Sequence, residues 1–373
     1  MKHRSLAGRV YHHVQQLRLY QQEKYTNYIL YVTNRCNLTC EHCFYNAELN
    51  HPLKEFTVDE LKKMFEPIKG DCNSLILTGG EPFIRNDLFE VCKVLNESGV
   101  EYILIVTNGF FTDRVYDTVK KITEGLPDLS LAIQISLDGL CDTHSKIRQS
   151  RFSFDKLVAT ANKLKELPVD LTLKTFLSKS NFREIEEFAE YVDKNIGVQH
   201  SYDFVRGTET SGLPLTEAMS GFSPKDKSIF LDDNEIREAW KKLYSVYKKR
   251  GKGSLNKLFS AAGALTSLEV GAKTLLLRKS PGRCIAGDKM GVIYPNGDMG
   301  ICELMKVVGN VRQENYDLKK VWHNENSERQ RKHIDGCYCT HGCFQAYQYK
   351  PKFQQMLVKN IFRLALNGKP RVI

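Results

Sequence analysis

The fold is decided by residues 34–43, which read NRCNLTCEHC and place Cys36, Cys40 and Cys43 on one short segment. This segment directly follows the apolar run Ile29 to Thr33, which predicts a β-strand. In α/β barrels, the loops at the carboxyl ends of the strands carry the chemistry. Three thiolates there can hold three irons of a cubane cluster, whereas complete ligation by protein takes four cysteines. We therefore expect a cluster with one iron open to another ligand.

Around this segment, the chain from Tyr28 to about Val205 alternates apolar, β-branched runs with amphipathic stretches. Such alternation is typical of βα units around a parallel sheet, and six units can be counted. The first helix is predicted to begin after Thr57, because Glu60 completes a capping-box pattern. The strands are predicted at Ile29 to Thr33, Ser74 to Thr78, Tyr102 to Thr107, Leu131 to Ser136, Asp170 to Phe176 and Gln199 to Val205. Later helices are predicted near Asp87 to Ser98, Thr112 to Glu124, Ser153 to Leu167 and Asn181 to Asn195.

The pattern changes after Arg206, where a stretch with Gly, Ser, Thr and Pro predicts a loop through about Ser223. A helix is predicted near Asp233 to Arg250, and the dipeptide Asn296-Gly297 between two short apolar runs predicts a hairpin. We therefore expect five segments. They are a basic N-terminal extension (1–27), a partial barrel (28–223), a helical connection (224–283), a cysteine-rich hairpin and helix domain (284–349) and a basic amphipathic helix (350–373).

The composition is globular, with 42% hydrophobic and 26% charged residues in a chain of 373. Eleven cysteines without a basic, apolar leader argue against a secreted disulfide scaffold and fit a reducing cytosol. Cys72, Cys92 and Cys141 lie in or beside predicted barrel elements and are expected to be buried. No run reaches the roughly 18 apolar residues that a membrane-spanning helix needs. We therefore expect a cytoplasmic protein that is soluble or peripheral at a membrane.

The net charge of +10 is unevenly placed along the chain. After Tyr349 the sequence contains six Lys or Arg residues and no Asp or Glu, and the start of the chain is also basic. This bias suits an anionic substrate, an acidic electron-donor protein or an anionic membrane surface, and it also fits a solvated basic face. No RNA-binding or zinc-finger motif is present, so we do not expect nucleic acid as a partner.

Two simpler interpretations of the three cysteines are a structural zinc site, which prefers four ligands with paired CxxC spacing, and reduced core cysteines. The segment CNLTCEHC, however, resembles the CxxxCxxC loop of the radical S-adenosylmethionine (SAM) superfamily. The resemblance covers about Tyr28 to Val205. It implies a partial (βα)6 TIM-like barrel, a 4Fe-4S cluster on Cys36, Cys40 and Cys43, and SAM as the ligand of the open iron.

Residues after the next strands are also similar to motifs of this superfamily. Paired glycines let a backbone approach a ligand closely, although they also suit a plain turn. The first match, to a GGEP motif that contacts the amine of SAM, consists of Gly79, Gly80, Glu81 and Pro82. The others, which can bind the ribose, are Thr107 and Asn108 after the third strand and Ser136 and Asp138 after the fourth. Asp138 could as easily cap the turn that follows it.

Three further residues have different expected contacts. By the same resemblance, His42 stands where the adenine of SAM binds, and an ordinary surface histidine is the alternative. Arg148 resembles the arginine that pairs with the SAM carboxylate, although a surface arginine would look the same. Asn181 begins a predicted helix, and we expect it to be an N-cap rather than a ligand contact.

A second group of cysteines brackets the predicted hairpin. It resembles a SPASM or twitch domain, in which cysteines flank a hairpin and later ones complete an auxiliary 4Fe-4S site. A full SPASM domain has seven cysteines for two clusters, so five imply one auxiliary cluster. The alternative is a zinc site built from the same cysteines with His333 or His341. The five cysteines are Cys284, Cys302, Cys337, Cys339 and Cys343.

The resemblance implies an enzyme that cleaves SAM to a 5′-deoxyadenosyl radical, which takes hydrogen from a substrate carbon. The electron would come from a donor such as flavodoxin or ferredoxin. We expect the substrate to be a sugar, a lipid-linked sugar or another small anionic metabolite, which the basic termini suit. A peptide is the alternative, although only about 27 residues precede the first strand, too few for an appended leader-binding domain. From another class, a non-catalytic iron-sulfur or zinc scaffold remains an alternative.

Overall fold

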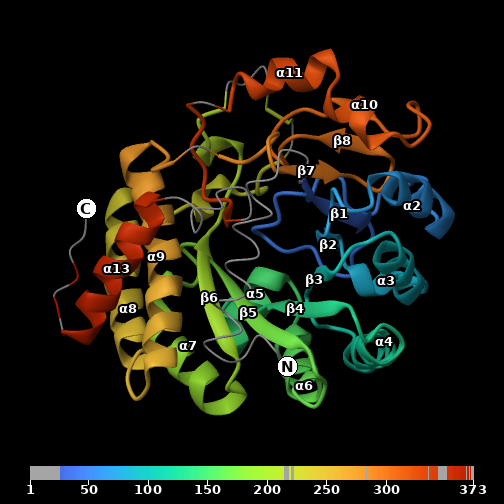
Figure 1. Cartoon of the computed structure of the whole chain (residues 1–373). Coiled ribbons are helices and arrows are strands. Elements are labelled where there is room, and N and C mark those ends of the chain that lie inside the picture. The colour runs from blue at the N-terminus through green and yellow to red at the C-terminus, as the bar shows by residue number, and fades with distance from the viewer. Residues whose placement is uncertain are drawn as a thin grey trace.

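The computed structural model describes residues 26–213, 218–219, 222–282, 284–334, 336–342, 351–366, 368 and 370. Within these residues, one curved sheet has nine strands in the order β6-β5-β4-β3-β2-β1-β7-β8-β9 and does not close into a full barrel (Figure 1). The six predicted strands are confirmed to within two residues at each end, and each pairs parallel with its neighbour. They are β1 (Asn27–Thr33), β2 (Ser74–Gly79), β3 (Tyr102–Thr107), β4 (Ser130–Ser136), β5 (Asp170–Leu177) and β6 (Gln199–Phe204).

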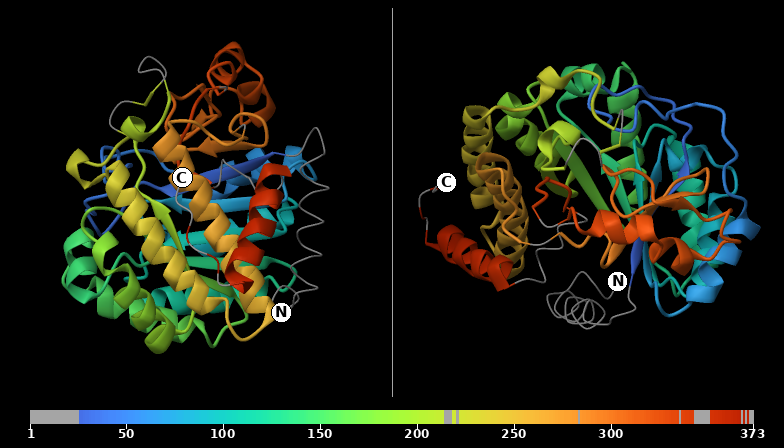
Figure 2. Two further views of the ribbon diagram at one scale, coloured as in Figure 1. Left: turned by 90° about the vertical axis from the view of Figure 1, so that its left-hand side faces the viewer. Right: turned by 90° about the horizontal axis from the view of Figure 1, so that it is seen from above.

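Helices between these strands surround the curved sheet (Figure 2). The first helix has the predicted capping box, because Thr57 Oγ1 accepts from Glu60 N and Glu60 Oε2 accepts from Thr57 N. The helix predicted over Asn181 to Asn195 is shorter, since a 3₁₀ turn precedes it and a π turn ends it. The helices are α2 (Val58–Phe65), α3 (Leu88–Glu97), α4 (Thr112–Gly125), α5 (Cys141–Arg148), α6 (Ser153–Leu164) and α7 (Ile185–Tyr191).

The predicted hairpin is present, and it extends the barrel sheet. Strand β7 (Met290–Ile293) pairs parallel with β1, with Asn27 opposite Met290. It also pairs antiparallel with β8 (Asp298–Gly300), which in turn pairs with β9 (Gly309–Asn310). The sequence predicts the hairpin but not its pairing with β1. Because of this pairing, the strand that precedes the three cysteines has a neighbour on both sides.

Two long helices follow β6. Helix α8 (Asp233–Arg250) packs against α9 (Leu255–Leu277), and α9 also contacts β6. The C-terminal helix α13 (Pro351–Ala365) lies on the outer side of α9 (Figure 2). None of the helices in the described ranges is long and apolar enough to cross a membrane. Two short helices near the hairpin are α10 (Leu318–Trp322) and α11 (Glu325–Arg331).

The three cysteines expected to be buried in the barrel differ in exposure. Cys72 and Cys92 are buried, as predicted, and both belong to the main hydrophobic core. Cys141 is exposed, so this prediction is wrong. It occupies the first position of α5, a short helix of mostly polar residues whose buried side chains are His144, Ile147 and Arg148.

Candidate active site

The carboxyl ends of the parallel strands surround one cavity. The cysteine loop after β1 forms one wall, and the segments after β2 and β3 and the end of β4 contribute small or polar residues. Most of the predicted SAM contacts therefore line the same space, but Glu81, Pro82 and Asp138 do not. The predicted site residues that line it are Cys36, Cys40, His42, Cys43, Gly79, Gly80, Thr107, Asn108, Ser136 and Arg148.

Burial is the largest influence on the pKa of each of the three cysteines in this loop. It raises the pKa of Cys36 and the pKa of Cys43 to about 12. Burial also raises the pKa of Cys40, although Arg148 Nη1, 3.5 Å from Cys40 Sγ, opposes the shift. Such thiols become thiolates only when a cation binds them. Three half-buried thiols on one cavity wall fit an iron-sulfur cluster with an open iron.

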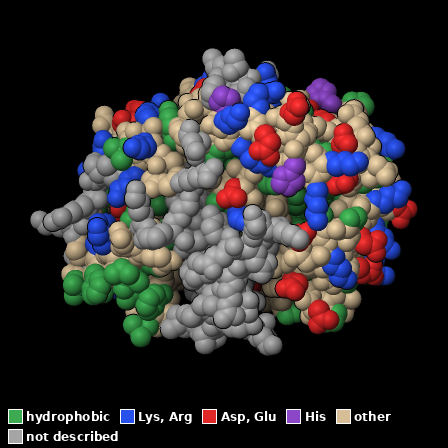
Figure 3. Space-filling view, turned by 45° about the horizontal axis from the view of Figure 1, so that its top comes forward, with side chains coloured by type: hydrophobic (Ala, Val, Ile, Leu, Met, Phe, Trp, Pro, Cys, Tyr) green, Lys and Arg blue, Asp and Glu red, His purple; other side chains and the backbone are tan. Residues whose placement is uncertain are grey.

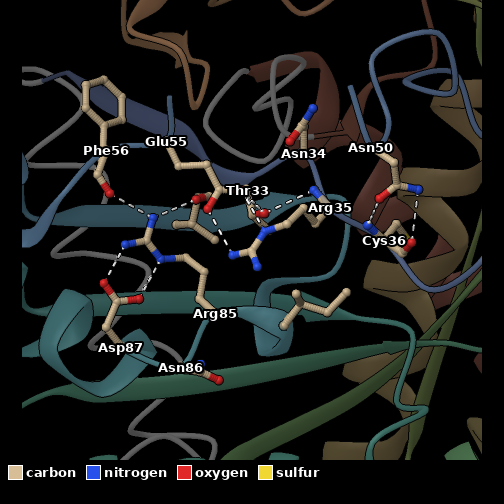
Figure 4. A network of polar contacts seen from close by, with 12 residues as sticks. Thr33, Asn34, Arg35, Cys36, Asn50, Glu55, Phe56, Arg85, Asn86 and Asp87 are labelled. Carbon is tan, nitrogen blue, oxygen red and sulfur yellow. Dashed lines mark hydrogen bonds and ion pairs between the residues drawn. The ribbon is translucent and has the colours of Figure 1, made fainter. Parts of the chain in front are cut away.

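Residues that follow the cysteine loop fold back and hold it (Figure 4). Asn50 has a φ of +61°, and its Oδ1 accepts a hydrogen bond from Cys36 N at 2.9 Å. Asn50 Nδ2 donates to Cys36 O at 3.1 Å, so one side chain binds both backbone groups of the first cysteine. Arg35 donates two hydrogen bonds to Glu55, at 3.1 and 3.0 Å. The position of Cys36 is therefore fixed by residues outside the CxxxCxxC motif.

The paired glycines after β2 bring two backbones together. A Cβ on Gly79 would lie 2.1 Å from Thr33 O, and a Cβ on Gly80 would lie 2.1 Å from Arg35 O. The backbone N of Gly80 and of Glu81 donate to these same two carbonyls, at 2.9 and 2.8 Å. Only glycine fits such a close approach. These two amides thus bind the cysteine loop, while both glycines still line the cavity.

Glu81 joins the loops after β2 and β3 from below the cavity. Its carboxylate accepts hydrogen bonds from Thr107 Oγ1 at 2.8 Å, Asn108 N at 2.7 Å and Phe83 N at 3.1 Å. Burial raises the pKa of Glu81 to about 7, even though these hydrogen bonds oppose the shift. The next residue, Pro82, begins a 3₁₀ turn. The acidic residue of this motif therefore positions Thr107 and Asn108, which do line the cavity.

Asp138 is fully buried and orients two residues of the cavity wall. It forms an ion pair with Arg148 and lies 3.8 Å from His42 Nε2, and its Oδ1 accepts from Phe176 N at 3.0 Å. Burial would raise the pKa of Asp138, but Arg148 and His42 outweigh this effect and lower it. Burial lowers the pKa of His42 to about 4, although Asp138 opposes this shift. Near neutral pH, His42 is therefore uncharged and Arg148 is the cation of this wall.

Asn181 stands at the predicted N-cap position, directly before the 3₁₀ turn Phe182–Glu184. Its side chain makes no capping hydrogen bond to the turn that follows. Instead, Nδ2 donates to the carbonyls of Asp138 and Phe176, both at 2.9 Å, and Oδ1 accepts from Ser178 N at 2.9 Å. Asn181 thus ties the segment after β4 to the end of β5. Its side chain points back to the sheet because three buried backbone groups there need partners.

Four cysteines of the second group come together from three distant segments. Burial raises the pKa of Cys302, and the nearby thiols of Cys339 and Cys284 raise it further. A hydrogen bond between Cys337 and Cys339 raises the pKa of Cys337. Four cysteines are enough to ligate one 4Fe-4S cluster completely. The fifth predicted ligand, Cys343, lies outside the described residues.

The alternative zinc site finds little support in these contacts. Among the described residues, no three His, Cys, Asp or Glu side chains converge closely enough to hold a single metal ion. His341, one of the two histidines considered as a ligand, is buried and bonds through Nε2 to Glu303. A cubane cluster spreads its cysteines more widely than one ion spreads its ligands.

Glu303 connects the cavity to the second group of cysteines, and the sequence predicted no role for it. This buried carboxylate accepts from Tyr31 OH at 2.5 Å and from Arg206 Nη2 at 2.8 Å, and it also bonds to His341. Burial would raise the pKa of Glu303, but Arg206 and His341 outweigh this and lower it to about 2. Arg206 lines the cavity, while Glu303 directly follows Cys302. The only sequence signal for Glu303 was its position directly after Cys302, a predicted cluster ligand.

Two family models match the chain. The model of the radical SAM superfamily matches residues 30–192, and the SPASM model, an iron-sulfur cluster-binding domain, matches residues 284–344. An AdoMet-dependent heme synthase of Methanosarcina barkeri is 24% identical over 300 residues, which cover 79% of this chain and 80% of that protein. A GTP 3′,8-cyclase of Helicobacter pylori is 32% identical over 194 residues, which cover 49% of this chain and 56% of that protein.

A solved structure shares the fold. SuiB of Streptococcus suis bound to the precursor peptide SuiA has a TM-score of 0.57 and 17% identity, covering 85% of this chain and 69% of that one. The two matching domains imply a 4Fe-4S cluster with SAM and an auxiliary iron-sulfur cluster, and the two groups of cysteines fit both clusters. Residues 30–192 therefore form a radical SAM domain, and residues 284–344 form a SPASM iron-sulfur domain.

Proposed function

We propose that the protein cleaves SAM reductively to a 5′-deoxyadenosyl radical and uses that radical to take hydrogen from a substrate carbon. The observation that carries this proposal is the shared cavity, which Cys36, Cys40 and Cys43 line together with the glycines after β2. When bound by these cysteines, a reduced 4Fe-4S cluster supplies the electron for the cleavage. The chain itself contributes binding, orientation and exclusion of water.

The Arg148 side chain is held where it can bind the carboxylate of SAM. Asp138 pairs with one side of the guanidinium, and Cys40 Sγ lies 3.5 Å from Nη1. Both contacts position Arg148 on the cavity wall beside a cysteine of the cluster loop. A guanidinium has five donors, so these contacts leave capacity for a bidentate bond to a carboxylate. We assign Arg148 to that carboxylate.

The ribose and the adenine of SAM match the other residues of the cavity wall. Thr107, Asn108 and Ser136 stand at the ends of neighbouring strands, where hydroxyl and amide groups can bind the ribose. His42, uncharged near neutral pH, has its ring centre 6.0 Å from that of Phe176. Two flat rings on one wall suit an adenine. We therefore assign the adenine to the side of His42.

Anaerobic incubation of the iron-loaded protein with SAM and dithionite tests this function. We expect 5′-deoxyadenosine, detected by chromatography and mass spectrometry, and none from a Cys40→Ala variant. Cys92→Ala, which changes a cysteine buried far from the loop in α3, is the matched control and should retain the product. An iron-loaded wild type that never forms 5′-deoxyadenosine would leave only the non-catalytic scaffold.

For the substrate, we infer a small anionic molecule such as a sugar or lipid-linked sugar. Among the described residues that line the cavity there is no Asp or Glu, whereas Arg148 and Arg206 are both present. The Arg206 guanidinium carbon lies 4.5 Å from the centre of the Phe44 ring and is oriented by Glu303. Arg206 stands after β6 and lines the same cavity as the loops assigned to SAM. An arginine supported in this way suits a phosphate or carboxylate group.

A peptide is the second candidate, and the likeness to SuiB bound to a precursor peptide favours it. Anaerobic assays with nucleotide sugars, lipid-linked sugar phosphates and synthetic peptides separate the two, because the substrate is consumed as 5′-deoxyadenosine forms. We expect consumption of an anionic sugar, with KM raised about tenfold by Arg206→Gln and less by Arg206→Lys. Consumption of a peptide with KM unaffected by Arg206→Gln would refute the sugar assignment.

The electron donor is expected to be an acidic protein such as flavodoxin or ferredoxin. The net charge of +10 favours association with an acidic partner. Such donors work in the reducing cytoplasm, where free thiols persist. Reduction of the clusters by flavodoxin in place of dithionite should sustain 5′-deoxyadenosine formation, and the rate should fall steeply as salt is added.

A further inference from the structure

One corner of the molecule exposes large apolar side chains. On α13, Val358 and Phe362 are 49% and 60% exposed, and Leu366, directly after the helix, is 76% exposed. Their spacing of four residues places them on one face of the helix. At the start of α9, Leu255 and Phe259 are 68% and 40% exposed. Figure 3 shows hydrophobic side chains gathered at the lower left, at the α9 and α13 side of the molecule.

These apolar side chains are not needed to pack α13 onto the protein. The opposite face of α13 is already buried, with Asn360 donating to Thr266 Oγ1 at 3.0 Å and to Glu269 Oε2 at 2.9 Å. Leu364 is also buried on that face. Helix α13 runs antiparallel to α9, so the end of α13 and the start of α9 lie at the same end of the molecule (Figure 1). The exposed residues of both helices therefore form one surface, named here the α9/α13 corner.

The two parts of the chain that form this corner are basic and contain no acidic residues. Residues 239–268 include seven Lys or Arg and no Asp or Glu, and the described residues 353–366 include Lys359 and Arg363 and no acidic residue. Lys252, Lys257 and Lys359 are exposed around the apolar side chains. Among the described residues of these helices, Arg250 pairs with Asp193, Lys242 lies near Glu186 and Glu238, and Arg363 of α13 lies near Glu269. The outer face of the corner is thus both apolar and positive.

We propose that the α9/α13 corner docks the protein on an anionic membrane surface. The apolar side chains would enter the headgroup region, and the surrounding lysines would bind lipid phosphates, as in basic amphipathic helices that lie in the interface. The lysines around the apolar side chains favour an anionic membrane over a neutral protein surface as the partner. A neutral protein surface would be bound by the apolar residues alone. The contact is interfacial and is independent of the reaction in the cavity.

Co-sedimentation of the full-length, iron-loaded protein with vesicles tests the docking. The protein should pellet with vesicles of equal parts phosphatidylglycerol and phosphatidylcholine, and not with phosphatidylcholine alone, and added salt should release it. Phe362→Glu should lower the partition coefficient about tenfold, and Lys257→Ala and Lys359→Ala about fivefold each. Phe152→Glu is the matched control, because Phe152 is 63% exposed but lies before α6, and it should pellet like the wild type.

Two results would overturn the proposal. One is equal pelleting with neutral and anionic vesicles, or equal loss in the Phe362→Glu and Phe152→Glu variants. The other is a wild-type dimer that Phe362→Glu converts to a monomer in sedimentation velocity, which would make the corner an interface between copies of the chain. Formation of 5′-deoxyadenosine in solution should be the same in Phe362→Glu as in the wild type. A failure of docking is therefore distinguishable from a failure of the proposed chemistry.

Discussion

The two groups of cysteines are built in opposite ways. Cys36, Cys40 and Cys43 lie on one loop after one strand, and the backbone of the first is fixed by the nearby Asn50. The described cysteines of the second group come from three segments between Cys284 and Cys339, which meet only when the hairpin has joined the sheet. The first site depends on local contacts, and the second depends on the whole C-terminal arrangement. Changes in one region should therefore affect the two sites unequally.

The largest effect should come from removing the first site. Replacing Cys36, Cys40 and Cys43 together by Ala should lower the iron content by about four and abolish 5′-deoxyadenosine formation. The second group should keep its cluster, because its ligands come from other segments. Iron analysis and electron paramagnetic resonance check both statements. Loss of all iron in this variant would show that the two sites assemble as one unit.

It should also be possible to remove the second cluster while the first cluster stays in place. Cys302→Ala combined with Cys339→Ala should also remove about four irons but leave SAM cleavage in place. The physical reason is that neither residue lines the cavity that holds the first loop. Product from the true substrate is expected to be lost, because the auxiliary cluster is then missing. If the double variant forms no 5′-deoxyadenosine at all, the separation of the two sites is wrong.

A smaller effect is expected at the ion pair that links α2 to the segment after β9. Arg312 donates to both oxygens of Glu60, at 2.8 and 3.1 Å, and Tyr316 OH donates at 2.9 Å. Glu60→Gln should lower the free energy of unfolding by about 2 kcal/mol, measured by urea denaturation. Glu90→Gln, in an exposed pair with Lys121, is the control and should change it by less than about 0.5 kcal/mol.

The same carboxylate predicts a pH dependence. The hydrogen bond from Arg312 is the largest cause that lowers the pKa of Glu60, from 4.5 to about 2. A lowered carboxylate pKa stabilises the folded state at pH values above 4.5, and this contribution is lost as the pH falls toward 2. The difference in stability between wild type and Glu60→Gln should therefore shrink over that range. A difference that stays constant from pH 6 to pH 2.5 would contradict this assignment.

A more local test concerns the side chain that holds the first cysteine. Asn50→Ala removes both hydrogen bonds to the Cys36 backbone, and the cluster should be lost to a chelator about tenfold faster. The spectrum of the reduced cluster should shift as well, which a purely structural defect elsewhere would not cause. Asn96→Ala, which removes a hydrogen bond to Val100 O at the end of α3, is the control. If the chelator removes the cluster equally fast from both variants, Asn50 does not stabilise the cluster site.

The smallest effect is expected at Cys141. Because it is exposed at the start of α5, Cys141→Ser should change the free energy of unfolding by less than about 0.5 kcal/mol and leave the iron content unchanged. Cys72→Ser, at a buried position, should lower the stability by about 1 to 3 kcal/mol. Thermal unfolding of both variants provides the comparison. Loss of iron from Cys141→Ser would add this residue to the site.

The sequence predicted the parallel strands and the cap at Thr57 because these features have local patterns. It missed α5, because the residues of this helix are mostly polar and form no continuous apolar face. Two of its buried side chains, His144 and Arg148, contact Asp138 instead. The reversed orientation of Asn181 could not be predicted either, because its partners lie on β5 and the segment after β4. Local periodicity specifies elements, while the partners of a buried polar group depend on the complete fold.

The candidate site also contains residues that local motifs predicted and residues that only the complete fold reveals. The residues of the cysteine loop and of the glycine pair were predicted from motifs, and the structure places them around one cavity. The motifs did not indicate that Glu81 binds protein groups. Glu303, whose carboxylate bonds to three side chains from distant segments, carried no periodic or motif signal beyond its place after Cys302. Such residues become visible only when distant segments have been brought together.

The pairing of β7 with β1 has a consequence for how the chain is made. During synthesis, β1 leaves the ribosome early, but its partner from Met290 onward follows only after the other parallel strands and helices. Until then, β1 is an edge strand with unpaired backbone groups, which is the kind of strand that pairs with other chains. The strand that presents the first cysteine loop is therefore completed late in folding. Iron loading of a nascent or truncated chain would therefore act on a loop whose strand is still unpaired on one side.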